Sequence, residues 1–208
     1  MAYRRTIAAG ASEDRLTRLI EERLKPGADK EKIDGRIWDL FGEEWCVMFT
    51  DLAGFSRGVE KFGIIHFLQT IVEAERLLIP IIGEHDGILL KIEGDSFLVI
   101  FRKTRKAIQC SLSMHDVLKR YNETKPDEEK ILLCIGLGYG RMLRVGDADV
   151  FSSEVNAASK LGEDIAKAWD ILVTEAVFEE CKGAPGLKFE VLGDAPAGTK
   201  KAYRVVEG

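Results

Sequence analysis

The sequence lacks several features, and each absence excludes a class of protein. Its 208 residues include only 4 cysteines and 5 prolines, and its formal net charge of -5 comes without any basic stripe. That balance argues against a general affinity for nucleic acid, which requires clustered Lys and Arg. No segment approaches the roughly 20 apolar residues of a membrane-spanning helix, and the N-terminal stretch is too short and too little apolar for a signal peptide. We therefore expect neither a nucleic-acid partner nor a membrane span.

The cysteines indicate a reducing compartment. Cys46, Cys110, Cys134 and Cys181 are far apart, lie mostly in apolar runs and form no metal-ligand pair. Such residues usually pack as reduced core side chains, so no disulfide framework is expected. The sequence is typical of a cytoplasmic protein with one sizeable domain and an appendage.

Residues 1–44 are predicted to be a charged helical appendage, and residues 45–208 the main domain. One amphipathic helix is expected over residues 12–25, and Pro26-Gly27 terminates it. A second, shorter helical pattern leads to Gly42. Their apolar stripes are expected to serve packing or a dimer contact. The apolar positions are Leu16, Leu19, Ile20, Leu24, Ile33, Ile37, Trp38, Leu40 and Phe41.

The main domain alternates between strand and helix patterns. Strands are predicted at residues 45–50, 87–93, 96–101, 130–138, 171–173, 187–192 and 201–206, and helices at 57–79, 104–121, 153–167 and 174–182. This βαββαβ order with extra C-terminal elements predicts an α/β (α+β) fold, a ferredoxin-like sandwich with a mainly antiparallel sheet. We expect the helices to cover one face of the sheet and to leave the other face for a partner.

Two aspartates are the most informative residues of the chain. Asp51 ends the apolar run that starts at Trp45, and Asp95 lies in the run Lys91-Ile-Glu-Gly-Asp95. Carboxylates on neighbouring rigid strands suit Mg²⁺ or Mn²⁺ bound to phosphates. The alternative is that Asp51 caps the following helix and Asp95 fills a hairpin turn. Their joint occurrence favours phosphoryl-transfer chemistry.

Four ordered segments resemble the successive motifs of class III nucleotidyl cyclases. They are Phe49–Ser56, Lys91–Asp95, Gly136–Arg141 and Asp149–Lys160, and the resemblance runs from about residue 45 to 206. It implies a head-to-tail homodimer with two composite active sites that act on a nucleoside triphosphate. One protomer would supply the metal half of each site and the other the base and ribose half.

The resemblance implies a metal site and a phosphate site. Asp51, Asp95 and the carbonyl of Leu52 would hold two Mg²⁺ or Mn²⁺ ions. One ion would activate the ribose 3′-hydroxyl and the other would bind the triphosphate, so that pyrophosphate leaves.

The phosphates themselves would be held by backbone and arginine. Ala53, Gly54 and Phe55 would offer backbone N–H groups to the β- and γ-phosphates. Arg141 would add a charge-assisted contact. Arg141 could also be an exposed turn residue, with Arg144 serving instead.

The base pocket separates adenine from guanine. Lys91 and Asp149 match the donor and acceptor positions of adenylyl members, so ATP is the favoured substrate. The two residues could also pair with each other as a salt bridge across the dimer interface. Glu93 lies on the same strand face as Lys91 and could compete for it.

The ribose and transition-state positions include departures from the family pattern. Asn156 resembles the asparagine that positions the ribose, although it could be a helix N-cap. Lys160, one helical turn later, stands where the family has an arginine. Lysine keeps the positive charge but lacks the bidentate geometry of a guanidinium. The family's second phosphate lysine has no clear match, although Lys200 and Lys201 are within reach of the loop.

Three functions compete at this point. The leading hypothesis is an adenylate cyclase, a phosphorus–oxygen lyase that converts ATP to 3′,5′-cyclic AMP and pyrophosphate. The second is a degenerate cyclase-homology domain that binds a nucleotide or acts only by dimerisation. The third is a cyclase that uses GTP or a pyrimidine triphosphate. The two aspartates favour an enzyme.

Overall fold

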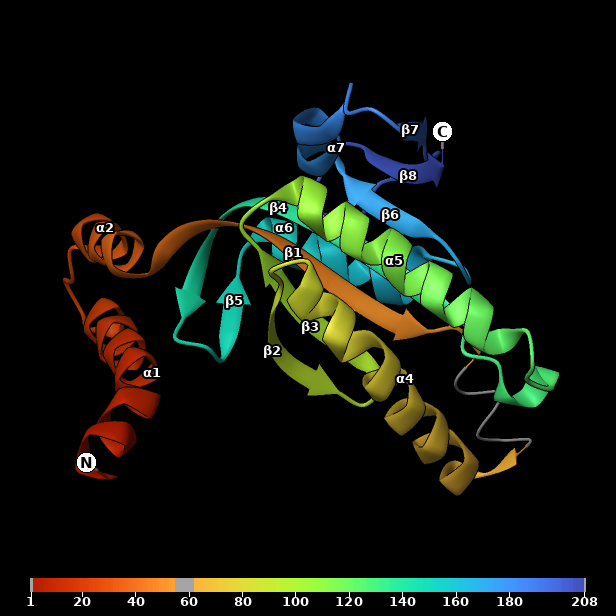
Figure 1. Ribbon diagram of the computed structural model, residues 1–208. Coiled ribbons are helices and arrows are strands. Elements are labelled where there is room, and N and C mark those ends of the chain that lie inside the picture. The colour runs from red at the N-terminus through yellow and green to blue at the C-terminus, as the bar shows by residue number, and fades with distance from the viewer. Residues whose placement is uncertain (1, 55–61, 208) are drawn as a thin grey trace. The chain divides into compact units, whose positions relative to one another are not determined.

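The computed structural model describes residues 2–54 and 62–207 (Figure 1). The chain divides into two compact units. Unit 1 consists of Met1–Glu44 and Arg141–Ser152, and unit 2 of Trp45–Gly140 and Ser153–Gly208. The N-terminal segment thus shares its unit with a hairpin from the middle of the sequence.

The predicted βαββαβ order is confirmed. Its elements are β1 (Gly42–Leu52), α4 (Ile64–Glu84), β2 (Ile88–Glu93), β3 (Ser96–Phe101), α5 (Thr104–Asn122) and β4 (Leu133–Val145). The C-terminal additions are β6 (Ile171–Thr174), α7 (Glu175–Cys181), β7 (Leu187–Val191) and β8 (Ala202–Glu207). The sheet order is β2-β3-β1-β4-β6-β8-β7, and β4 pairs with β6 in parallel while β2/β3, β1/β3, β6/β8 and β7/β8 are antiparallel.

One face of the sheet packs against α4 and α5. Alternate residues of β4, Leu133, Ile135 and Leu137, join the same buried cluster as Ile108 and Leu118 of α5. Side chains two residues apart on a strand share a face, so this face of β4 is the helix-covered one. Burial of each large aliphatic side chain contributes roughly 1.5–3 kcal/mol to folding.

The opposite face of β4 is also covered, which corrects the expectation that all helices lie on one side. A Cβ at Gly136 would lie 2.1 Å from the Ala158 carbonyl oxygen, and one at Gly138 would lie 2.5 Å from that of Glu154. Helix α6 (Ser153–Ser159) and the π-helix η2 (Lys160–Ile165) therefore pack directly on the strand. In Figure 1, α6 lies behind the sheet and α5 in front of it. Glycine at alternate positions allows this approach.

Several boundaries differ from the predicted ones. Helix α1 (Ala2–Leu24) starts well before residue 12, and α4 continues through Pro80 to Glu84. Helix α2 (Lys30–Phe41) leads to its C-cap Gly42 as expected. The start of the helix predicted over 57–79 lies outside the described residues. Strand β4 continues to Val145 and turns at Gly146, whose φ is +60°, into the short strand β5 (Asp149–Phe151), which the sequence pattern did not reveal.

Candidate active site

The sheet brings Asp51 and Asp95 together. Asp51 lies near the end of β1 and Asp95 lies in the turn that joins β2 to β3. Strand β1 pairs with β3, and the backbone N–H of Phe97 donates to the buried Thr50 hydroxyl at 3.0 Å. The turn itself needs the positive φ of Gly94, +62°. The two carboxylates are consequently held on neighbouring strands, near enough for the charge of Asp95 to act on Asp51.

The electrostatics of this pair suit a cation. Burial first, and then the nearby charges of Asp95 and Glu163, raise the pKa of Asp51 to about 7. Burial also raises the pKa of Asp95, although hydrogen bonds from its own backbone N–H and that of Leu52 oppose this shift. Its Oδ2 atom is buried without a hydrogen-bond partner. A divalent cation would satisfy that oxygen and remove the repulsion, so the residues present fit a metal ion.

No third protein ligand is evident. Among the residues that the structure describes, no three His, Cys, Asp or Glu side chains gather as metal ligands. The Leu52 carbonyl, which directly follows Asp51 in the chain, stays a predicted further ligand. A bound ion would complete its shell with water or phosphate oxygens, as Mg²⁺ commonly does.

The predicted phosphate loop is only partly described. The N–H of Ala53 donates to the Leu132 carbonyl at 2.8 Å, so in this conformation it is not directed at a phosphate. Gly54 has a φ of +90°, and nothing lies within 4 Å of the position of a Cβ there. Phe55 lies outside the described residues.

Lys91 and Glu93 form an ion pair on the second face of the sheet. The distance from Lys91 Nζ to Glu93 Oε1 is 3.1 Å, and Glu93 is the more exposed of the two. Together with Phe49, Ser96 and Glu163 they line a narrow hollow. Glu93 would therefore compete with a nucleotide base for Lys91, as the sequence predicted, and both residues belong to the same strand.

Asn156 and Lys160 line another hollow. They lie four residues apart, on α6 and at the start of η2, and the loop residues Ala197 and Gly198 form the opposite wall of a space of about 420 Å³. A Cβ at Gly198 would lie 2.4 Å from the Ser153 carbonyl oxygen, so this loop packs closely on α6. Asn156 lies inside the helix, which excludes the N-cap alternative.

Two acidic residues of this region were missed by the sequence reading. Glu154 accepts hydrogen bonds from the Thr174 hydroxyl at 2.7 Å and the Tyr139 N–H at 3.2 Å, and burial raises its pKa. It therefore ties α6 to β4 and β6. Glu163 accepts a hydrogen bond from the Ser159 hydroxyl and raises the pKa of Asp51. Only their partners in space reveal these roles, since their sequence spacing carries no signal.

The other predicted substrate residues lie in unit 1. The Arg141 guanidinium carbon is 4.8 Å from the centroid of the Trp38 ring, and Nη2 donates to the Trp38 carbonyl at 3.4 Å. Arg144 pairs with Asp147 at 2.7 Å. Asp149 is half-buried in β5, and its Oδ1 accepts from the Val150 N–H at 2.9 Å.

Comparison with known proteins agrees with this architecture. The family model described as the adenylate and guanylate cyclase catalytic domain matches residues 42–204. A serine/threonine-protein kinase, pkn2, of Myxococcus xanthus is 30% identical over 131 residues, which are 63% of this chain and 16% of that protein. The putative adenylate cyclase 3 of Rhizobium meliloti is 25% identical over 144 residues, 69% of this chain and 24% of that protein. The match therefore covers a small part of each relative.

Solved structures share the fold. The adenylate/guanylate cyclase/hydrolase of Silicibacter pomeroyi has a TM-score of 0.66 at 24% identity, covering 79% of this chain and 95% of that one. The adenylyl cyclase CyaB of P. aeruginosa has 0.64 at 19% identity, covering 80% and 95%. The guanylate cyclase domain of RhGC from Catenaria anguillulae, in complex with GTP, has 0.66 at 18% identity, covering 79% and 97%. In the part of this chain that the structure describes, no helix is long and apolar enough to cross a membrane.

Proposed function

Because the chain belongs to the adenylate and guanylate cyclase catalytic domain family, we propose that it is an adenylate cyclase that converts ATP to 3′,5′-cyclic AMP and pyrophosphate. The observation that carries the proposal is the pair Asp51 and Asp95 on neighbouring strands. The Oδ2 atom of Asp95 is buried and has no hydrogen-bond partner. Such an arrangement is costly for a fold unless a cation binds there.

The two aspartates and the Leu52 carbonyl would hold Mg²⁺ or Mn²⁺, two ions in the proposed mechanism. When bound, these ions lower the pKa of the ribose 3′-hydroxyl and neutralise the charge of the triphosphate. The chain's contribution is to hold the carboxylates on rigid strands, so that little reorganisation is needed during the reaction. The 3′-oxygen attacks the α-phosphate in line, and pyrophosphate is the leaving group.

Base recognition is assigned to Lys91 and Asp149. Lys91 donates to N1 of adenine and Asp149 accepts from the N6 amino group, whereas guanine presents the inverse pattern. The Lys91–Glu93 ion pair favours a second candidate, a cyclase with relaxed base choice that also takes GTP or a pyrimidine triphosphate, because Glu93 occupies part of the lysine's donor capacity.

The proposed site is composite. The lining of the hollow that contains Asn156 and Lys160 does not include Asp51 or Asp95, which supports a reaction centre whose ribose half and metal half come from different protomers. Asp51 and Asp95 of one protomer act with Asn156 and Lys160 of its partner in a head-to-tail homodimer. Asn156 orients the ribose, while Lys160 and Arg141 stabilise the charge that develops on the phosphates.

The decisive experiment is incubation of the purified chain with each of the four nucleoside triphosphates and Mn²⁺, followed by mass analysis of the cyclic products. We expect cyclic AMP as the main product. A comparable yield of another cyclic nucleotide would support relaxed base choice. The absence of any cyclic product, with nucleotide binding intact, would support the degenerate domain instead.

A further inference from the structure

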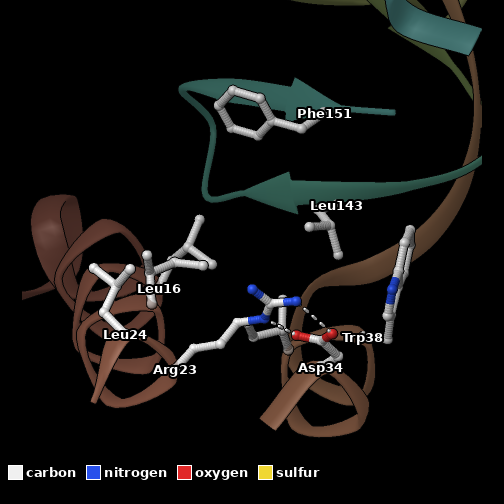
Figure 2. A pocket seen from close by; sticks show the side chains of 9 residues that line it. Leu16, Arg23, Leu24, Asp34, Trp38, Leu143 and Phe151 are labelled. Carbon is white, nitrogen blue, oxygen red and sulfur yellow. Dashed lines mark hydrogen bonds and ion pairs between the residues drawn. The ribbon is translucent and has the colours of Figure 1, made fainter. Parts of the chain in front are cut away.

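Unit 1 contains a cavity that the cyclase reaction does not use. It has a volume of about 390 Å³ and lies between α1, α2 and the β4–β5 hairpin (Figure 2). Leu16, Ile20 and Leu24 of α1 form one side, and Trp38, Leu143 and Phe151 contribute to the rest of the lining. Its volume falls in the lower part of the usual range for small-molecule sites, roughly 300–1,000 Å³.

The cavity lies on a buried hydrophobic cluster and has an exposed apolar rim. Leu19, Ile33, Ile37 and Phe41 form a buried cluster, and Leu16 and Leu143 pack against it. The rim is solvent-exposed instead: the exposed fractions are 76% for Leu24, 49% for Phe151 and 42% for Ile20. Large apolar side chains that surround a preformed hollow favour an apolar occupant, because its binding removes their surface from water.

The charges in the lining specify the occupant further. Arg23 and Asp34 are the charged lining residues, and they form a two-pronged ion pair with distances of 2.6 Å from Nε to Oδ1 and 3.1 Å from Nη2 to Oδ2 (Figure 2). The pair has no net charge, so a charged ligand would lose its hydration in an apolar cavity without meeting an unpaired opposite charge. An uncharged ligand can bind without that cost.

The walls of the cavity also position two proposed substrate residues. The Trp38 ring that lines the cavity holds the Arg141 guanidinium at 4.8 Å, and the Trp38 carbonyl accepts its hydrogen bond. Phe151 lies two residues after Asp149 on β5, so the two side chains share a strand face. Displacement of Trp38 or Phe151 by a ligand would therefore act on Arg141 and Asp149.

From these contacts we propose that the cavity is an effector site for an uncharged, largely apolar small molecule, and that its occupant changes the affinity for the nucleotide through Arg141 and Asp149. The coupling rests on the proposed function, whereas the binding does not. If both ligands bind, each must change the affinity of the other by the same factor.

Two matched fluorescent probes test the site directly. N-phenyl-1-naphthylamine is uncharged, and 8-anilinonaphthalene-1-sulfonate has the same aromatic skeleton with an added sulfonate. We expect saturable fluorescence enhancement with the neutral probe and at least about tenfold weaker binding of the sulfonate, the equivalent of about 1.4 kcal/mol. Ile20→Trp fills the cavity from an exposed rim position and should weaken the neutral probe about tenfold. Leu40→Trp, on an exposed part of α2 outside the lining, should leave its affinity within about twofold.

Other outcomes would overturn the proposal. Equal affinity of both probes, or equal binding by Ile20→Trp and Leu40→Trp, would show that the probe does not occupy this cavity. Light scattering tests whether a second copy of the chain occupies the cavity instead, because it measures the oligomeric state. If Phe151→Glu and Leu24→Glu dissociate a dimer that excludes the probe, the cavity is an interface between two copies. Coupling is then measured by repeating the titration with a non-cyclisable ATP analogue. Probe binding without any shift would remove the coupling, and failure of cyclase activity alone would leave the probe titrations unaffected.

Discussion

Two pairs of side chains, one in each unit, show how neighbours decide the role of an aspartate. In unit 1, Asp34 faces Arg23, and the hydrogen bond and charge of that guanidinium lower the pKa of Asp34. In unit 2, Asp51 faces Asp95 in a partly buried position, and its pKa is raised to about 7. The first pair is complete within the protein. The second is a pair of like charges with one buried carboxylate oxygen that has no hydrogen-bond partner, and these two properties identify it as a candidate site.

The largest effect is expected from removal of the second pair. Asp51→Ala or Asp95→Ala should reduce cyclisation at least about a thousandfold, because several kcal/mol of metal-assisted stabilisation is lost. The fold and oligomeric state should persist. Asp34→Asn is the matched control and should leave kcat within about twofold. Steady-state rates with ATP and Mn²⁺ check this, and near wild-type turnover in either unit 2 variant would exclude the two-metal assignment.

Mixing two inactive variants tests whether the two halves of each active site come from different protomers. Asp51→Ala and Asn156→Ala should each be inactive, because each removes one half of both composite sites. Random exchange between subunits of a two-fold dimer should restore about a quarter of the wild-type rate, from one intact site in half of the dimers. Continued inactivity, with exchange demonstrated by differently tagged subunits, would contradict the head-to-tail arrangement.

Replacement of Lys160, whose ammonium group is proposed to contact the phosphates, is expected to have a smaller effect on turnover. Lys160→Arg provides two parallel donors, and an added charge-assisted hydrogen bond is worth roughly 1.5–3 kcal/mol at best. Turnover should rise several-fold to about a hundredfold with little change in KM, because the contact forms mainly in the transition state. Lys160→Ala should lower turnover. If Lys160→Ala has no effect in an active enzyme, Arg141, Arg144 and Lys200 are the next candidates for variation.

The smallest effect concerns stability without metal. Because the pKa of Asp51 is higher in the folded state than its usual value of 3.8, the folded protein binds more protons, and stability falls as the pH rises from about 4 to about 7. Asp51→Asn should therefore raise the melting temperature at pH 8 by about 2–4 °C, or about 1 kcal/mol after allowance for partial exposure, and by less at pH 5.

The control for this prediction has the opposite sign. The pKa of Asp34 is lowered in the folded state, so its contribution to stability is present above its usual pKa and is lost as the pH falls through the lowered value. Asp34→Asn should lower the melting temperature at pH 7. Thermal unfolding in a chelator measures both variants, and identical pH profiles would contradict the assignment. Added Mn²⁺ should stabilise the wild type but not Asp51→Asn.

Much of the fold was determined by local sequence. Apolar periodicity and the turn at Gly94 predicted the helices, the βαββαβ order and the strands other than β5, because these patterns depend on neighbours along the chain. The same local signals placed Asp51 at the end of a strand and Asp95 in a hairpin turn. Their approach then followed from the pairing of β1 with β3.

Other features were decided only by the tertiary structure. The packing of α6 on the second face depends on the space above Gly136 and Gly138, and the pairing of Arg141 with Trp38 joins residues far apart in the sequence. Glu154 and Glu163 acquire their roles from partners on other elements. The pKa of Asp51 likewise depends on burial and on charges brought near by folding. The sequence by itself determined which residue types could do the chemistry, whereas distance and desolvation, which exist only in the folded chain, decided which of them meet and with what charge.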